Sequence, residues 1–294
     1  MTPERSATWG TLLQEGRRSL GPPAFAPFEA EELLARATGR PRRWFLSRGR
    51  DGAPGADAEA FLSLVRRRLS GEPLQYLLGE WEFRSRTFRV DPRALIPRGE
   101  TEGIVDVARS AAPLARRILD AGTGSGILAV TIALEWPDAR VTALDRSTAA
   151  LDLALENAKA LGAIGRVSFV GSDWLSALRP AAGGAPPFDL VVANPPYVPL
   201  EDAPHLDKTV SDHEPSLALF GGADGLDPLR ELLASLPPLV RTGAPFVFEF
   251  GYGQASAVSD LVEASGTFRL SAIRLDAAGI PRTATAIRTD VRQA

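Results

Sequence analysis

The spacing of apolar residues divides the chain into a helical part and a strand-rich part. Up to about residue 75, apolar residues recur three or four positions apart, as in PFEAEELLARATG and ADAEAFLSLVRRRLSGEP. This spacing predicts amphipathic helices, and Gly39 and Gly71 follow the two runs where helix C-caps belong. We therefore expect a small helical N-terminal domain over residues 1–75.

Residues 76–98 show a different pattern. In WEFRSRTFRV, apolar residues alternate with polar ones on both sides of a short polar centre, which is typical of a β-hairpin. The prolines of the following DPRALIPRGETE break any regular element. We expect a hairpin linker over residues 76–98 and a larger domain over residues 99–294.

From Arg116 onward, short apolar runs alternate with helical patterns. We expect helices of roughly 10 to 15 residues between the first five strands. This alternation predicts a mostly parallel α/β sheet covered on both faces, in which ligands bind beyond the carboxyl ends of the strands. The seven candidate strands are RRILDAG, ARVTALD, RVSFVGS, FDLVVA, APFVFEF, FRLSAIRL and TATAIRT.

Composition and charge narrow the class of protein. The 294 residues, 45% hydrophobic and 23% charged, are ordinary for a globular protein, and no apolar run approaches the roughly 18 residues of a membrane span. We expect a cytoplasmic protein, because the chain has no cysteine and its N-terminus shows no secretion signal. His205 and His213 are the only histidines and the chain has no cysteine, so we expect no metal site.

Positive charge is concentrated near the N-terminus. Residues 1–75 carry twelve Arg against nine acidic residues, a net of +3, so the remainder carries −6 of the total net charge of −3. An enzyme that binds nucleic acid usually has the opposite balance in its main domain. We therefore expect no direct nucleic-acid partner.

The segment ILDAGTGSGILAV, residues 118–130, predicts a strand, a glycine-rich turn and a helix. Its glycines allow close approach of the backbone to a ligand, and the helix offers free N–H groups. A nicotinamide fingerprint would have glycine at position 127, which is Ile127. Asp120 would repel a pyrophosphate but attract a cationic amino acid group, which favours S-adenosylmethionine. The predicted contacts are Asp120, Gly122, Thr123, Gly124, Ser125 and Gly126.

Two further strand ends carry candidate ligand contacts. Asp145 ends the second strand, where a carboxylate can accept from both hydroxyls of a ribose; capping of the next helix is the alternative, although Ser147 is available for that role. Asp173 and Trp174 follow the third strand. Trp174 can contact adenine or fill the core, and Asp173 can accept from the adenine amino group or cap a short helix.

The fourth strand ends in NPPY, residues 194–197. The prolines stiffen this corner, and we predict that the side-chain oxygen of Asn194 and the main-chain oxygen of Pro195 accept both hydrogens of an –NH2 group. The acceptor nitrogen of an in-line methyl transfer must lie about 3–3.5 Å from the methyl carbon. Pro196 and Tyr197 complete the predicted substrate site, with the ring of Tyr197 offering a flat face. The alternative is a turn in which Asn194 bonds its own backbone.

In several segments the chain resembles the HemK/PrmC family, the protein-(glutamine-N5) methyltransferases that modify peptide chain release factors. NPPY is shared with DNA adenine methyltransferases, whereas the segments around ETE and DGL are more specific. Gly99 stands where the family usually has proline, and His213 where an aromatic residue is common. The segments occur in the family order GEPLQYLLGEWEF, ALIPRGETE, LDAGTGSG, SDW, NPPYVP, HEPSLALFGGADGL and FEFGYGQ.

The resemblance implies a fold, a reaction and a set of site residues. The fold is a Rossmann-like, seven-stranded class I S-adenosylmethionine methyltransferase domain with a small helical domain and a linking hairpin. The reaction is methyl transfer to the glutamine side chain in the Gly-Gly-Gln loop of a release factor. Residues 122–126, Asp145, Trp174 and Asn194 would contact the cofactor, and residues 194–197 would hold the glutamine.

Other functions share parts of this pattern. A glutamine methyltransferase for a ribosomal protein would use the same NPPY chemistry, with substrate choice in the N-terminal 75 residues. The acidic main domain argues against a DNA adenine-N6 methyltransferase, and the complete motif set argues against a binding module without catalysis. We expect a monomer with no membrane partner. Arg98, Glu100, Glu102 and Glu249 are expected near the pocket, with structural ion pairing as an equal alternative.

Overall fold

The computed structural model describes residues 7–21, 26–179 and 188–290. The chain forms two compact units. The first consists of Met1–Glu80 together with Asp207–His213, and the second of Trp81–Leu206 together with Glu214–Ala294. Among the described residues, none of the helices combines the length and the hydrophobicity needed to cross a membrane.

The first unit is helical, as the apolar spacing predicts. Trp9, Leu33 and Phe61 are among the buried residues of its core. Gly16 lets two of its helices approach closely, because a Cβ at this position would lie 2.6 Å from the ring of Phe61. The helices are α1 (Trp9–Ser19), α2 (Ala26–Thr38), η1 (Arg42–Phe45), α3 (Gly55–Leu69), α4 (Leu74–Leu78) and α8 (Lys208–Ser211).

The expected hairpin is formed by β1 (Glu80–Phe83) and β2 (Arg86–Arg89). Arg84 and Ser85 both have positive φ, at 48° and 57°, as the turn of a two-residue hairpin requires. Glu102 stabilises this turn, because its carboxylate accepts a 2.7 Å hydrogen bond from the Arg84 main-chain nitrogen. Glu102 therefore has a structural contact at the hairpin.

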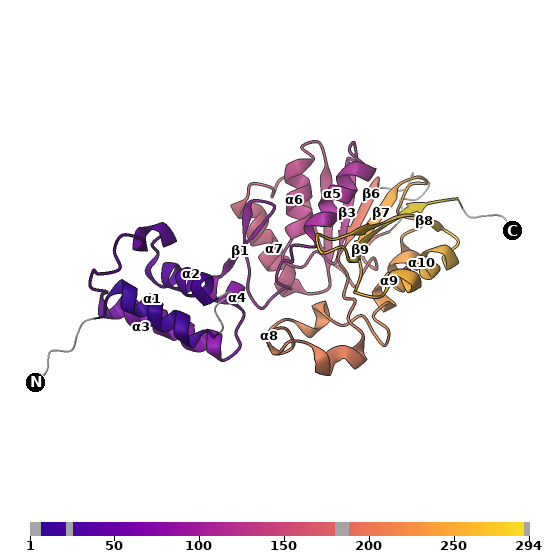
Figure 1. Ribbon diagram of the computed structural model, residues 1–294. Coiled ribbons are helices and arrows are strands. Elements are labelled where there is room, and N and C mark those ends of the chain that lie inside the picture. Colours follow the sequence, from indigo (N-terminus) through magenta and orange to yellow (C-terminus); the bar gives the residue numbers. More distant parts are fainter. Residues whose placement is uncertain (1–6, 22–25, 180–187, 291–294) are drawn as a thin grey trace, which may run out of the picture. The chain divides into compact units, whose positions relative to one another are not determined.

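The second unit contains the seven predicted strands in one mixed sheet (Figure 1). The strand order is β5-β4-β3-β6-β7-β9-β8; the first five strands are parallel, and β9 is antiparallel to both β7 and β8. The strands are β3 (Arg117–Ala121), β4 (Arg140–Asp145), β5 (Val167–Gly171), β6 (Leu190–Ala193), β7 (Pro245–Glu249), β8 (Phe268–Leu275) and β9 (Pro281–Arg288).

Helices cover both faces of this sheet, because successive strand residues point to opposite sides. Ile118 of β3 belongs to one buried cluster, shared with α5 (Glu102–Ala111), α6 (Ile127–Glu135) and α7 (Thr148–Ala160). Its neighbour Leu119 belongs to another, shared with α9 (Asp227–Ser235) and α10 (Ala255–Ala264). The remaining short helices are η2 (Leu200–His205) and η3 (Ser216–Ala218).

The helix expected between β5 and β6 is not seen in the residues that the structure describes there. Residues 172–179 form no helix, Phe188 forms an isolated β-bridge with Val240, and residues 180–187 lie outside the described part of the chain. Trp174 prevents a helix from starting directly after β5, because its φ of 45° is incompatible with a right-handed helix. Residues 174–177 therefore form a turn near the end of β5.

The strand order places the predicted motifs at one edge of the sheet. From β3 the chain adds β4 and β5 on one side, whereas β6 and β7 lie on the other side. The carboxyl ends of β3 and β6 thus flank a reversal of strand order, which is the usual ligand site of open α/β sheets. The glycine turn follows β3, and Asn194 follows β6.

Candidate active site

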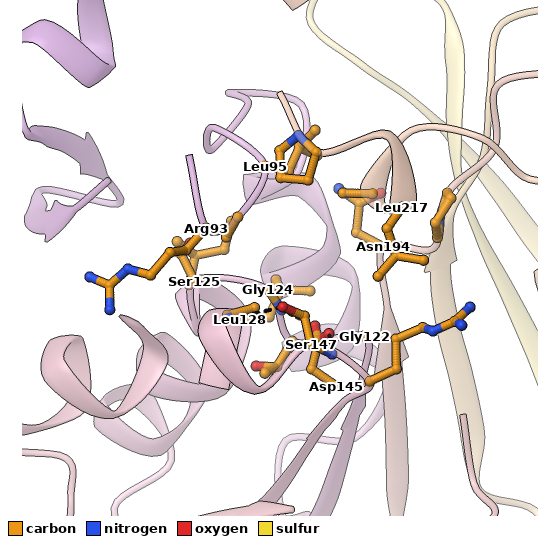
Figure 2. A pocket seen from close by; sticks show the side chains of 18 of the residues that line it. Arg93, Leu95, Gly122, Gly124, Ser125, Leu128, Asp145, Ser147, Asn194 and Leu217 are labelled. Atoms are coloured by element: carbon orange, nitrogen blue, oxygen red, sulfur yellow. Dashed lines mark hydrogen bonds between the residues drawn. The ribbon is translucent and has the colours of Figure 1, made fainter. Parts of the chain in front are cut away.

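A cavity of about 1000 Å³, its open mouth included, lies beyond the carboxyl ends of these strands within the second unit. Figure 2 shows Gly122, Gly124 and Asp145 together on one part of its wall, with Asn194 and Leu217 on another. The wall is built from residues 93–98, Thr101, 122–125, Ile127, Leu128, 144–147, Ala150, Ser172, Trp174, Asn194, Pro196, Pro215, Leu217 and Ala218.

The glycine turn takes a shape that other residues adopt only with strain. Gly122, Gly124 and Gly126 all have positive φ, between 54° and 83°. At Gly126 an added Cβ would also lie 2.9 Å from the Cβ of Ala154, so α6 and α7 approach closely there. Gly122 to Ser125 line the cavity, whereas Gly126 lies behind it and contacts α7.

Asp120 lies under the glycine turn and is completely buried. Its Oδ2 accepts hydrogen bonds from the hydroxyl of Thr123 at 2.6 Å and from the main-chain nitrogen of Ala129 at 3.0 Å. Its Oδ1 has no hydrogen-bond partner among the described residues. Burial raises the pKa of Asp120 to about 7. The side chain thus holds the turn from below and does not itself line the cavity.

Asp145 lies on the cavity wall at the end of β4. Its Oδ2 accepts from the Gly124 nitrogen at 2.8 Å, and its Oδ1 accepts from the Ser147 nitrogen at 2.9 Å. Burial raises the pKa of Asp145, although the hydrogen bonds from Ser147 and Gly124 act to lower it. Ser147 caps α7 through its own side chain, so Asp145 is not needed as the helix cap.

Asp173 and Trp174, which follow β5, have different environments. Trp174 lines the cavity, and its ring lies 3.6 Å from the position that a Cβ on Gly122 would occupy. The ring of Trp174 therefore packs beside the glycine turn. Asp173 is outside the lining residues, and its carboxylate lies 3.9 Å from the guanidinium of Arg146.

At the NPPY corner a buried hydrogen-bond network holds Asn194. Its Nδ2 donates to Thr101 Oγ1 at 3.0 Å, and Thr101 Oγ1 donates to Glu249 Oε2 at 2.8 Å. The phenol of Tyr197 donates to Glu249 Oε1 at 3.2 Å. Burial raises the pKa of Glu249, and it also raises that of Tyr197. Asn194 and Thr101 line the cavity, and Tyr197 does not.

The two prolines of the corner differ in exposure. Pro195 is buried and lies outside the lining residues, whereas Pro196 is half-buried and lines the cavity. The Cβ that Gly221 lacks would lie 2.6 Å from the main-chain oxygen of Pro196. The segment after η3 therefore packs directly against the corner.

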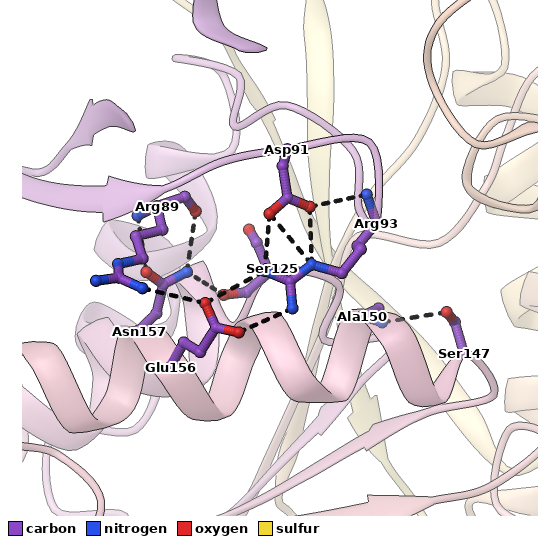
Figure 3. Close-up of polar contacts among 8 residues, drawn as sticks. All are labelled: Arg89, Asp91, Arg93, Ser125, Ser147, Ala150, Glu156 and Asn157. Atoms are coloured by element: carbon purple, nitrogen blue, oxygen red, sulfur yellow. Dashed lines mark hydrogen bonds and ion pairs between the residues drawn. The ribbon is translucent and has the colours of Figure 1, made fainter. Parts of the chain in front are cut away.

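Polar contacts from α7 hold the glycine turn and the segment after the hairpin (Figure 3). Asn157 donates to the carbonyl oxygens of Ser125 at 2.9 Å and Arg89 at 3.1 Å. Arg93 forms ion pairs with Asp91 and Glu156. One helix thus fixes two parts of the cavity wall.

Sequence reasoning missed Thr101, Asn157 and Glu214. Glu214 accepts from the Ile96 nitrogen at 3.0 Å and pairs with Arg98. The segments that carry Thr101 and Glu214 stand out by resemblance, but their partners lie more than a hundred positions away. No local pattern identifies such pairs.

Comparisons with known proteins agree with this architecture. A family model described as the PrmC N-terminal domain matches residues 11–79, and one described as the methyltransferase small domain matches residues 104–207. Among solved structures, the catalytic domain of hMettl16 in complex with a MAT2A 3′UTR hairpin has a TM-score of 0.54 at 14% identity, over 69% of this chain and 76% of that one. This last likeness concerns the fold alone.

Curated relatives are much more similar in sequence. The chain is 42% identical over 264 residues to the release factor glutamine methyltransferase of Moorella thermoacetica, which covers 89% of this chain and 91% of that protein. The Bordetella pertussis protein of the same name is 41% identical over 277 residues, with coverages of 92% and 97%. The chain therefore belongs to the family of release factor glutamine methyltransferases.

Proposed function

We propose that this protein transfers a methyl group from S-adenosylmethionine to the side-chain amide nitrogen of the glutamine in the Gly-Gly-Gln motif of a peptide chain release factor. The observation that carries the proposal is that the glycine turn, Asp145 and Asn194 line one cavity. A donor and an amide acceptor can therefore meet there. The chain is an S-adenosylmethionine-dependent methyltransferase of the release factor glutamine methyltransferase family.

The residues of the cavity fit this cofactor. Asp145 offers a carboxylate that can accept from ribose hydroxyls, and Trp174 and Ile127 offer apolar surface. Residues 122–125 bring main-chain groups close to the ligand. When bound, S-adenosylmethionine supplies an electrophilic methyl group on a positively charged sulfur. Neither Asp120 nor Asp173 lines the cavity. We propose that Asp120 acts on the cofactor through the glycine turn that it holds, and we retain Asp173 as a proposed contact.

Asn194 is suited to orient the substrate amide. Its Nδ2 is engaged by Thr101, so its Oδ1 is available as an acceptor at the cavity wall. We propose that this oxygen and the main-chain oxygen of Pro195 accept the two hydrogens of the glutamine –NH2 group. The nitrogen lone pair then faces the methyl group, while Pro196 and Tyr197 flank the glutamine.

Orientation and charge stabilisation carry the proposed catalysis. An amide nitrogen is a poor nucleophile, because its lone pair is delocalised over the amide. During transfer a nitrogen–carbon bond forms, the carbon–sulfur bond breaks, and its electron pair stays on sulfur. The acceptors at Asn194 and Pro195 stabilise the positive charge that develops on nitrogen. The nitrogen then loses a proton to water.

We further propose a division of labour along the chain. Residues 1–75 act in recognition of the release factor, residues 76–98 link the domains, and residues 99–294 catalyse the transfer. The match of residues 11–79 to a domain named for this family supports a role of the N-terminal part that is specific to the family. We propose that the protein acts as a monomer in the cytoplasm, where release factors work, without direct nucleic-acid or membrane partners.

Mass spectrometry of the substrate tests the proposal. The purified chain is incubated with S-adenosylmethionine and a release factor, and the Gly-Gly-Gln peptide is sequenced. We expect one added methyl group on the glutamine side chain. A ribosomal protein and a DNA duplex with adenine sites serve as competing substrates, and transfer to either one without transfer to the release factor would refute the proposed function.

A further inference from the structure

Three hydrogen bonds connect Asn194 to the phenol of Tyr197 through two buried groups. Asn194 donates to Thr101, Thr101 donates to Glu249, and Tyr197 donates to the second oxygen of Glu249, at 3.0, 2.8 and 3.2 Å. Thr101 is completely buried and Glu249 is 2% exposed. Of these four residues, Thr101 and Asn194 line the cavity.

The negative charge of Glu249 determines which atom donates and which accepts in each of these hydrogen bonds. An ionised carboxylate only accepts hydrogen bonds, so Thr101 must use its single hydroxyl hydrogen toward Glu249. The Thr101 oxygen can then only accept from Asn194. This contact requires the nitrogen of the Asn194 amide, so the amide oxygen is directed away from Thr101. The orientation of the amide therefore follows from the hydrogen-bond network.

We propose that Glu249 and Thr101 are positioning residues, which act through this network to present the oxygen of the Asn194 amide, and not its nitrogen, to the substrate. The proposal rests on the proposed function, because it assumes that the substrate group is an –NH2 whose hydrogens need an acceptor. A reversed Asn194 amide would offer its own hydrogens to the substrate nitrogen, and the two donors would repel each other.

The surroundings of Glu249 determine the pH range in which these hydrogen bonds keep the same donors and acceptors. Burial raises the pKa of Glu249, the hydrogen bonds from Thr101 and Tyr197 and the charge of Arg282 lower it, and the charge of Glu100 raises it. Once Glu249 is protonated, it can donate to Thr101, which frees the Thr101 hydrogen for the Asn194 oxygen. The correct orientation is therefore present above the raised pKa of Glu249 and lost as the pH falls through it.

Two substitutions at Thr101 distinguish the effect of its hydroxyl group from the effect of its side-chain volume. Thr101→Val keeps the volume and removes the hydroxyl, whereas Thr101→Ser keeps the hydroxyl. We expect Thr101→Val to lower kcat by about tenfold or more, with the cofactor Kd within about twofold of wild type, and Thr101→Ser to stay within about threefold in kcat. Equal kcat for Thr101→Val and wild type would overturn the proposal, as would equal impairment of both variants in folded protein.

Thr131→Val is the matched control. Thr131 is also completely buried, and its hydroxyl has no hydrogen-bond partner among the described residues. It lies on α6, outside the cavity lining. We expect this variant to match wild type in kcat. A fall equal to that of Thr101→Val would assign the effect to general loosening of the core and overturn the proposal.

The pH profile of kcat at saturating cofactor tests Glu249 itself. In wild type, kcat should fall as the pH drops through the raised pKa of Glu249. In Glu249→Gln we expect a lower kcat at neutral pH and no such fall, because the titrating group is gone. An unchanged acid limb in Glu249→Gln would overturn the role of its charge.

The activity of the wild-type protein distinguishes failure of this inference from failure of the proposed function. If wild type methylates no glutamine amide, the proposed function fails, and this inference fails with it. If wild type methylates the glutamine and Asn194→Ala abolishes the activity while Thr101→Val does not affect it, the proposed function stands and the network fails.

Discussion

The guanidinium of Arg98 pairs with the buried carboxylate of Glu214 at 2.5 Å, although 116 positions separate them in the chain. Glu214 also accepts from the main-chain nitrogen of Ile96. This carboxylate therefore joins two segments that line the cavity, residues 93–98 and 215–218. Among the carboxylates of the described chain it is one of the least exposed, with 1% of its side chain accessible.

Replacement of Glu214 by alanine should destabilise the protein. The change leaves the Ile96 N–H and the Arg98 guanidinium without their partner. We expect a loss of about 2 kcal/mol in the free energy of unfolding. This loss is smaller than that for a fully buried pair, because Arg98 is partly exposed. Urea denaturation measures the loss. Glu201→Ala removes an exposed carboxylate of the same unit, and an equal loss in both variants would contradict the role given to Glu214.

Replacement of Gly126 by alanine should lower the free energy of unfolding more than replacement of Gly162 by alanine. Both glycines have positive φ, at 83° and 73°, but only at Gly126 would the new Cβ meet another atom, 2.9 Å away on Ala154. We expect Gly162→Ala to cost about 1 kcal/mol from backbone strain, and Gly126→Ala to cost at least about 1 kcal/mol more. Equal unfolding free energies for the two variants would show that α6 and α7 do not approach closely here.

The buried carboxyl of Asp120 predicts a pH dependence of stability. Its pKa is about 7 in the folded protein against an ordinary value of 3.8. Since the folded state binds this proton more tightly than the unfolded state, its contribution to stability is fully present below about pH 3.8 and is lost as the pH rises to about 7.

Comparison of wild type with Asp120→Asn checks this dependence. Asparagine keeps an oxygen for Thr123 and Ala129 but does not ionise. We expect the unfolding free energy of wild type relative to the variant to fall, by an amount on the order of 3 kcal/mol, as the pH rises from about 4 to 7. A difference that is constant over this range would contradict the raised pKa.

Asp145 should govern cofactor affinity. Replacement by asparagine removes its negative charge and one acceptor at the cavity wall, and we expect the Kd for S-adenosylmethionine to rise by about tenfold or more. Calorimetric titration measures the change, with Asp152→Asn, an exposed position on α7, as the control. Unchanged affinity in Asp145→Asn would remove Asp145 from the cofactor site.

The sequence predicted the sheet well because the signals for its strands are local. Runs such as FDLVVA and APFVFEF are short, apolar and bounded by glycine, proline or polar residues, and they form β6 and β7. In the described residues after β5 no helix follows Trp174, whose positive φ cannot be inferred from residue type. Tryptophan rarely adopts this conformation.

The site was predicted in part for the same reason. Gly122, Asp145 and Asn194 lie directly after strands whose order follows from the fold, so their convergence on one cavity could be expected. Thr101 and Glu249 meet only through tertiary packing, 148 positions apart. Glu249 was expected near the pocket, but its hydrogen bond with Thr101 and the contact of Thr101 with Asn194 could not be inferred from the sequence.

The turnover of Asn194→Ala with a release factor substrate measures how much the Asn194 oxygen contributes to orienting the substrate amide. We expect the variant to bind S-adenosylmethionine with nearly wild-type affinity and to lose at least about tenfold in turnover, worth ~1.4 kcal/mol of transition-state stabilisation. A variant that keeps its cofactor affinity and loses less than this would contradict the claim that the Asn194 oxygen orients the substrate amide.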